Sequence, residues 1–326
     1  MKYSIFALIV LSLACTKKEA PAEAPAEESE AALAEAAAPE TEPAVEDSQE
    51  APPVETAPVI ELIDAGKPPL RTLRWAFEPG EAQGLLWKSD YTFHAQRKGA
   101  EKQPIKVLPR MRQRLELSVV SVSDDGLAEV SYEALSDEII KTPKVSPGVH
   151  ITPAKGVRGT YKVDARGVVS EFSLSLPEGL NQDADLEYVE NLLRLTVLPV
   201  PSEAVGVGAK WSVTREGERR GIPMKERLSV ELIRAEGARV ELAFELQSEG
   251  SRESEVAPRG KLLGVRFEEY SWNATGRLKT NLSAVVPKRA DVDNELVLSS
   301  RFESPGNAPD QLDMKVSREL EMRATK

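Results

Sequence analysis

Few residues in this chain are of the types that commonly carry out chemistry, and they do not form a recognisable catalytic set. The two histidines are His94 and His150, and the only cysteine is Cys15. His94 follows Phe93 in an alternating segment, so the two side chains should face opposite ways. We interpret His94 as solvent-facing rather than as a general base. His150 is expected in a loop. With one thiol and no paired histidines, a zinc site lacks its ligands.

Carboxylates are abundant, but their spacing does not define a site. Glu268 with Glu269, and Asp291 with Asp293, are candidate pairs for glycoside chemistry, which depends on a separation in space that a sequence does not give. Asp291–Glu295 resembles the start of a calcium loop, but the downstream glycine and glutamate spacing is missing. The serine elbow of hydrolases and the phosphate-binding glycine loop with its lysine are both absent. We therefore expect a non-enzymatic protein without a cofactor, and a hydrolase is the weaker alternative.

Two further groups of side chains each allow two interpretations. Arg110, Arg112 and Arg114 share one face of an expected strand, and Arg219 and Arg220 lie near a turn. They form either a surface for an anionic partner or a solvated face balanced by neighbouring glutamates, and we favour the second. The four tryptophans either pack in the core, which we favour, or stack on sugars. They are Trp75, Trp87, Trp211 and Trp272.

The N-terminus has the pattern of a bacterial export signal. Lys2 is followed by the apolar run Ile5–Leu11, which is too short to cross about 30 Å of hydrocarbon as a helix. Leu11–Cys15 resembles the lipobox of bacterial lipoproteins, although serine stands at position 12 where leucine is usual. The resemblance implies that residues 1–14 are removed and that Cys15, diacylated on sulfur, anchors the mature protein to a membrane. The alternative is an ordinary signal peptide in which this cysteine occurs by chance.

The destination of the anchored protein follows from the residue after the cysteine. By analogy with the sorting of lipoproteins in bacteria with two membranes, Thr16 is not the aspartate that favours retention in the inner membrane. We therefore expect the cell envelope, and preferably the outer membrane.

The acidity of the chain is confined to one segment. The net charge is −11, and 14 acidic residues but no Lys or Arg lie between Glu19 and Gly66, which leaves 39 residues of each sign in 67–326. A nucleic-acid partner is not expected, because the remainder is not basic. Residues 15–69 are rich in Ala, Glu and Pro, so we predict a disordered tether. A tail that binds a cationic partner is the alternative. Val59–Ile63 is more apolar and is expected to dock onto the domain.

From about Leu70 to the C-terminus the sequence predicts a mainly β domain. Apolar residues alternate with polar ones, which is typical of antiparallel sheets with one face in water. One amphipathic helix is expected near 183–196. The clearest alternating segments are 115–119, 172–176, 240–246 and 312–316. Turns are predicted at 124–126, 165–167, 236–237, 275–276 and 305–307.

The domain also shows signs of an internal duplication, with units of about 70–198 and 199–326. The three matching pairs are 161–167 with 270–276, 111–115 with 224–228, and 79–84 plus Trp87 with 201–206 plus Trp211. The shared Asp/Asn-Ala-x-Gly of the first pair predicts a hairpin turn in each unit. Two such units predict either one curved antiparallel sheet, such as a half-barrel, or two abutting sheets.

Two stretches of this domain resemble an uncharacterised bacterial lipoprotein family over about residues 72–325. They are Leu73–Gly80 and, after Pro199 and Pro201, Val205–Trp211. The resemblance implies no activity. In architecture, a lipid-anchored curved sheet is also similar to the periplasmic lipoprotein carriers, which hold acyl chains in a half-barrel. We therefore expect an envelope lipoprotein that binds a hydrophobic ligand or a protein partner. The alternative is a structural or assembly protein with a filled core.

Overall fold

The computed structural model describes residues 56–325, apart from 81, 102–103, 141–154, 178–190, 192, 220–221, 257–263 and 304–309. Its strands are β1 (Val59–Asp64), β2 (Lys67–Thr72), β3 (Ala82–Arg97), β4 (Lys106–Val107), β5 (Arg110–Val122), β6 (Ala128–Ile140), β7 (Arg158–Val163), β8 (Val169–Ser175), β9 (Ala204–Val207), β10 (Lys210–Arg219), β11 (Ile222–Glu236), β12 (Arg239–Val256), β13 (Gly264–Asn281), β14 (Arg289–Glu303) and β15 (Asp310–Thr325).

These strands form where apolar and polar residues alternate. In β5, Leu115, Leu117 and Val119 are buried, whereas the residues between them are exposed or half-buried. Of the other three predicted alternating segments, 240–246 and 312–316 lie within β12 and β15, and 172–176 lies in β8 except for its last residue. Each apolar side chain on the buried face contributes about 1.5–3 kcal/mol when it is fully removed from water. The predicted mainly β fold is confirmed.

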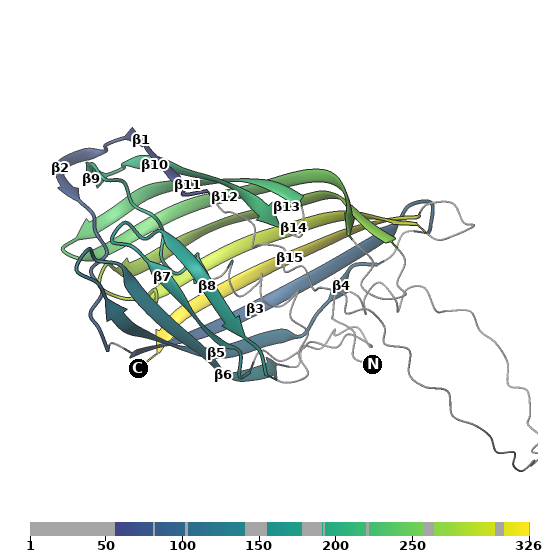
Figure 1. Ribbon diagram of the computed structural model, residues 1–326, viewed down its shortest axis with the longest axis horizontal. Helices are drawn as coiled ribbons and strands as arrows, with labels where there is room; N and C mark the ends of the chain where they lie inside the picture. The colour runs from purple at the N-terminus through teal and green to yellow at the C-terminus, as the bar shows by residue number, and fades with distance from the viewer. Residues whose placement is uncertain are drawn as a thin grey trace, which may run out of the picture.

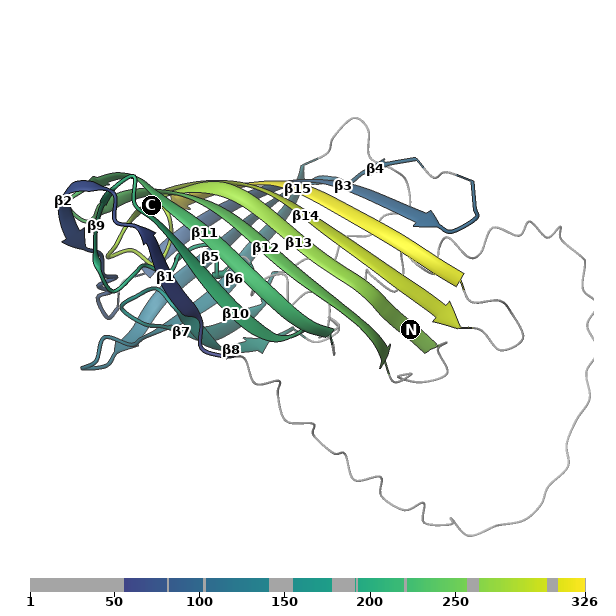
Figure 2. The same cartoon turned by 90° about the horizontal axis from the view of Figure 1, so that it is seen from above.

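One antiparallel sheet contains thirteen of the described strands, and β2 pairs with β9 in a small second sheet. The order across the large sheet is β1-β10-β11-β12-β13-β14-β15-β3-β5-β6-β7-β8, with β4 beside β3. The last strand of the chain, β15, therefore pairs with β3 along most of its length and joins the two halves. The sheet is curved but not closed, since β1 and β8 are its two edges. Figure 1 shows β7 and β8 in front of β11–β15, and Figure 2 shows the same curl from above.

Two of the three sequence matches fall at comparable places in the fold. Met111 and Met224 are both buried near the start of a long strand that forms a hairpin with the next strand. Trp87 and Trp211 both lie in strands of the large sheet, and both are almost fully buried. The strands that carry these residues all belong to one continuous sheet.

The third match is wrong as a structural equivalence. Residues 165–167 do form the turn between β7 and β8, where Asp164 accepts backbone hydrogen bonds from Arg166 and Val168. Residues 273–276, in contrast, lie in the middle of β13, so the predicted turn at Thr275 and Gly276 does not exist. The glycine is needed there for a different reason, because the ring of Phe244 on β12 covers it. A glycine can be required either by a turn or by close packing, and the sequence pattern does not distinguish the two.

The predicted tether boundary at residue 69 also needs correction. Val59–Asp64 forms β1, which pairs with β10, and Lys67–Thr72 forms β2. The docking expected of Val59–Ile63 is thus confirmed, and the ordered domain begins before residue 70. Of the helix predicted near 183–196, only its end at Asn191 and Leu193 is described, and residues 178–190 and 192 lie outside the described residues. The predicted turns at 124–126 and 236–237 are present, whereas 305–307 is not described.

Candidate functional site

The interior at one end of the curled sheet is filled by the chain segment 193–200, which begins with the last helical residue, Leu193. Every described side chain from Leu193 to Val200 is buried. Two indole N–H groups hold the backbone of this segment: Trp75 donates to the Leu198 carbonyl at 3.1 Å, and Trp211 donates to the Pro199 carbonyl at 2.8 Å. A buried carbonyl without a donor would cost about 1–3 kcal/mol, so these bonds fix the segment inside the curl.

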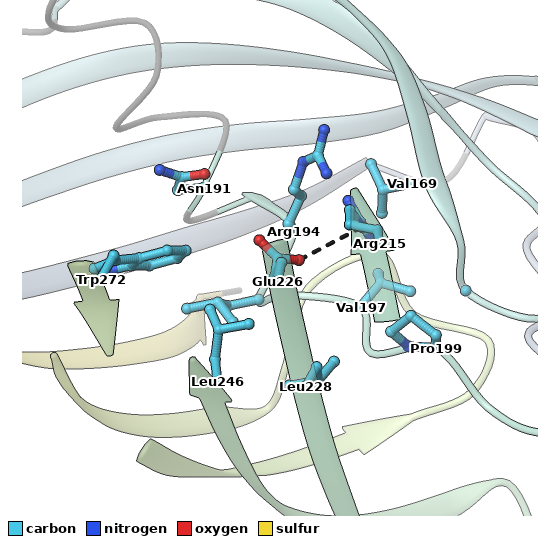
Figure 3. A pocket seen from close by; sticks show the side chains of 12 residues that line it. Val169, Asn191, Arg194, Val197, Pro199, Arg215, Glu226, Leu228, Leu246 and Trp272 are labelled. Carbon is cyan, nitrogen blue, oxygen red and sulfur yellow. Dashed lines mark ion pairs between the residues drawn. The ribbon is translucent and has the colours of Figure 1, made fainter. Parts of the chain in front are cut away.

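A small cavity of about 20 Å³ remains between this segment and the inner face of the sheet. Figure 3 shows Asn191 and Arg194 on one side of it and Glu226, Leu246 and Trp272 on the other. Such a volume accommodates a water molecule or a similarly small polar group. The lining residues are Gly167, Val169, Asn191, Arg194, Leu195, Val197, Pro199, Arg215, Glu226, Leu228, Leu246 and Trp272.

An ion pair inside the curl gives this cavity its polar character. Arg215 on β10 and Glu226 on β11 are directly opposite each other in the sheet, with 3.4 Å between Nε and Oε1. Their side chains are only 12% and 14% exposed, so the two charges are largely removed from water. Desolvation of a pair costs several kcal/mol per ion, and loss of one partner would leave a buried charge uncompensated. A substitution of either Arg215 or Glu226 alone should therefore be more destabilising than the replacement of both residues by neutral ones.

A second guanidinium lies beside the pair. Arg194 is 9% exposed, and its guanidinium carbon is 5.2 Å from the ring centre of Phe172 on β8. Asn191, one turn earlier, is 7% exposed, and its Oδ1 has no hydrogen-bond partner within the described part of the chain. Hydrogen-bond donors and acceptors thus converge on one small cavity inside an otherwise apolar interior.

Next to this cavity, several apolar side chains that face the interior are only half-buried. A bulge at Glu171, whose φ is +51°, shifts the alternation of β8 so that Val169 and Phe172 both face inward. On the opposite wall, Trp272, Leu296 and Val316 lie directly opposite one another on three neighbouring strands, and all three face inward. The half-buried inward-facing side chains are Phe172, Leu174, Leu176, Leu296 and Val316. The curl therefore retains accessible apolar surface beyond its filled end.

A larger hollow of about 610 Å³ lies on the opposite face of the sheet. It runs across β13, β14, β15 and β3, and exposed lining residues such as Asn273 and Thr275 flank the buried Ala274, which faces the core. One side of it is a row of three carboxylates in direct register, namely Asp293, Glu319 and Asp90. Asp90 in this row forms an ion pair with Arg110. On the other side of the hollow, Glu295 forms an ion pair with Lys315.

The residues singled out in the sequence are dispersed in the structure. His94 faces away from the buried Phe93 as predicted, and it is half-buried. Arg110 and Arg112 pair with Asp90 and Glu138, which confirms a balanced face at these two positions. Cys15, His150 and Arg220 lie outside the described residues, as does the Arg219 side chain. The four tryptophans are all buried, which confirms core packing.

The candidate acidic pairs do not come together as a site. Asp291–Glu295 is part of β14, and successive side chains of a strand point to opposite faces, so this stretch cannot wrap around calcium as a loop. Asp291 pairs with Arg289, and Glu268 pairs with Arg301. Within the described ranges, no three His, Cys, Asp or Glu side chains are close enough together to hold a metal ion.

The sequence analysis missed the interior charges, although the sequence contained their signal. Arg215 follows Trp211 and Val213 at intervals of two, and Glu226 stands between Met224 and Leu228 in the same way. Alternation places each charge on the buried face of its strand. Arg194 had no comparable signal, because its position depends on where the segment after the helix enters the sheet.

Comparisons with known proteins do not extend these observations. No protein-family model matches the chain, and no curated protein matches it. In the described residues, no helix is both long and apolar enough to cross a bilayer.

Proposed function

We propose that this chain is a lipid-anchored protein of the bacterial cell envelope whose curled sheet binds a hydrophobic ligand without chemical turnover. One observation carries the proposal: inward-facing apolar side chains on both walls of the curl, Phe172 and Leu174 on one and Leu296 and Val316 on the other, are only half-buried. Apolar surface inside a fold is favourable to cover, at about 25 cal/mol per Å². A ligand with an apolar body would cover it.

The anchor rests on the lipobox-like leader. Acyl chains on Cys15 would bind a membrane with about 0.8 kcal/mol per buried CH₂ group. We expect Cys15→Ala to move the protein from the membrane fraction to the soluble fraction, as measured by fractionation and immunoblotting, with Ser12→Ala as the matched leader control. Retention of the Cys15→Ala protein in membranes would show that the anchor is elsewhere.

A structural or assembly role is the second candidate, and the filled end of the curl favours it. The segment 193–200 occupies that end, and the cavity left beside it measures only about 20 Å³. In this case the interior would need no ligand, and the protein would act through its outer surface.

Native mass spectrometry separates the two candidates. The Cys15→Ala protein should be purified without detergent, and its mass should be measured before and after extraction with organic solvent. A non-covalent adduct that the extraction removes is expected. Val316→Trp, which fills the inner face, should lower the adduct, whereas Val297→Trp, on the outer face of the neighbouring strand, should not. A clean protein mass in every case would favour the structural role instead.

A further inference from the structure

Exposed apolar side chains gather at one end of the sheet. Ile63 at the end of β1, Leu70 on β2 and Val207 on β9 are 58%, 45% and 44% exposed. The three strands meet there, because the Ala65 carbonyl accepts a hydrogen bond from the Gly206 amide at 2.8 Å and β2 pairs with β9. Figures 1 and 2 both show these strands together at one end of the sheet, away from β4. We call Ile63, Leu70 and Val207 the apolar tip.

Part of the apolar tip is held on a stiff exposed stretch of chain. All four residues of Lys67–Leu70 are exposed, and two of them are prolines. Because the proline ring fixes φ, this stretch loses little conformational entropy when it meets a surface. Exposed apolar side chains that gather in one place, rather than singly, mark sites of contact with a protein or a membrane.

Basic side chains surround the apolar tip. Arg71 and Arg74 donate hydrogen bonds to backbone carbonyls, which are neutral and do not compensate the two positive charges. Lys210 is paired with a carboxylate, that of Glu231, at 3.8 Å. Residues 64–74 and 203–210 contain four basic and two acidic side chains, namely Lys67, Arg71, Arg74 and Lys210 against Asp64 and Glu203. The surface around the tip is therefore positively charged.

This combination fits a phospholipid surface better than a second copy of the chain. An apolar group with basic neighbours matches the boundary between acyl chains and anionic head groups. Two copies that met at their tips would bring like charges together. Three side chains also fall far short of the roughly 20–30 residues that each partner contributes to a standard protein interface.

The position of the tip relative to the expected anchor favours the same partner. The described chain begins at Thr56, just before β1, and Ile63 is at the other end of that strand. A coil with the length and composition of residues 15–55 has a mean span of about 35 Å. An anchor at Cys15 would therefore keep the tip near the bilayer, at an effective concentration on the order of millimolar. Even a contact too weak to hold the free chain on a membrane would then form.

We propose that the apolar tip is a second membrane contact, and that Ile63, Leu70 and Val207 enter the interfacial layer of a bilayer that contains anionic phospholipid. Lys67 would lie among the head groups. The contact would orient the domain, with the end of the sheet that carries β4 away from the membrane. This inference takes the lipid anchor from the proposed function, but it does not depend on the hydrophobic ligand.

Vesicle binding of the Cys15→Ala protein tests the contact without the anchor. Vesicles of phosphatidylcholine alone, or of phosphatidylcholine and phosphatidylglycerol in equal parts, are titrated through the millimolar range, and the bound fraction is measured by sedimentation. We expect binding to the vesicles with phosphatidylglycerol, and weaker binding to phosphatidylcholine alone. Lys67→Gln should lower the affinity for the anionic vesicles about fivefold and leave the affinity for neutral vesicles nearly unchanged.

A matched pair of variants assigns the binding to the tip. The double variant Ile63→Gln/Leu70→Gln should bind the anionic vesicles about tenfold more weakly, because two exposed apolar side chains are lost. Ile105→Gln, which removes a 66% exposed side chain next to β4, should bind like the parent protein. Every variant keeps the same N-terminal segment, so differences among them report the domain alone.

Three results would overturn the inference. They are no binding by the Cys15→Ala protein at millimolar lipid, equal binding by the double variant and by Ile105→Gln, and a dimer in analytical ultracentrifugation that the double variant abolishes. The last result would make a second copy the partner of the tip. None of them bears on the anchor or on the ligand, which are tested by fractionation and by native mass spectrometry, so failure of this inference is distinguishable from failure of the proposed function.

Discussion

At the scale of single residues, the close contact between Gly276 and Phe244 shows how the sheet packs. The two residues are directly opposite each other on β13 and β12, and a Cβ on Gly276 would lie 2.8 Å from the Phe244 ring and 2.7 Å from the Asp291 carbonyl oxygen. The ring occupies the space that a side chain would need, so glycine and aromatic form a complementary cross-strand pair.

Gly276→Ala is therefore expected to destabilise the protein by about 1–3 kcal/mol through overpacking. Urea unfolding followed by circular dichroism measures the change. The neighbouring Thr275→Ala faces outward and serves as the control, with an expected effect within about 0.5 kcal/mol. Equal, small effects at both positions would mean that the ring does not cover the glycine.

The buried hydroxyl of Tyr161 should make the free energy of unfolding depend on pH. Burial raises the pKa of its hydroxyl well above the ordinary value. In the unfolded chain the tyrosine hydroxyl releases its proton at about pH 10, whereas in the folded protein it does so only at higher pH. The free energy of unfolding therefore falls as the pH rises above about 10. Tyr161→Phe lacks this loss. Urea midpoints at pH 8 and pH 11 should show the variant gaining relative to the wild type, and a constant difference between the two proteins would contradict the prediction.

Residue by residue, the sequence predicted which face of a strand was buried, but not what lay across from it. His94 and the paired arginines Arg110 and Arg112 were placed correctly, since alternation is a local property. Gly276 was misplaced because its glycine is required by Phe244, a residue 32 positions away in the chain. The cavity was not predicted, since it depends on where Arg194 meets β10 and β11.

At the scale of elements, the segment 193–200 shows how an irregular stretch is held in a β interior. Its backbone carbonyls at Leu198 and Pro199 accept hydrogen bonds from Trp75 and Trp211, and the Val200 amide donates to the Arg166 carbonyl. These partners come from three separate parts of the chain. The segment therefore links the stretch before β3, the turn between β7 and β8, and β10.

The two indoles should act together. Trp75→Phe and Trp211→Phe each remove one donor and leave a buried carbonyl, at an expected cost of about 1–3 kcal/mol, plus the loss of ring area. Because both donors hold adjacent carbonyls, the double variant should lose less than the sum of the two single losses. Chemical denaturation of the four proteins gives this coupling. Strict additivity would show that the segment is not held as a unit.

Elements were predicted well where alternation is long and poorly where it is short. The strand segments at 115–119 and 240–246 were recognised, whereas the first half of β2, Lys67–Pro69, was assigned to the tether. This stretch offers no alternation, and its partner β9 is distant in the sequence. The edge strand β1 was recognised only as a docking segment.

At the scale of the whole molecule, the seam between β15 and β3 makes one sheet of two halves. The C-terminal strand lies beside the first long strand of the domain, so neither half has a complete set of neighbours alone. Val316 on the inner face of β15 is directly opposite the buried Phe93 of β3, so the inner apolar surface continues across this seam. The sequence left open whether the halves would merge or abut, since a pairing between the two ends of a domain has no local signature.

A cross-strand disulfide tests the seam directly. Thr92 on β3 and Ser317 on β15 are directly opposite each other, and directly opposed residues in antiparallel sheets lie within disulfide range. In a Cys15→Ala chain, Thr92→Cys with Ser317→Cys should oxidise fully, as measured by thiol titration and by a mass lower by two hydrogens. The pair Thr92→Cys with Asn273→Cys, three strands apart in the same row, should stay reduced. If the first pair also stayed reduced under the same oxidant, the single curled sheet would be contradicted.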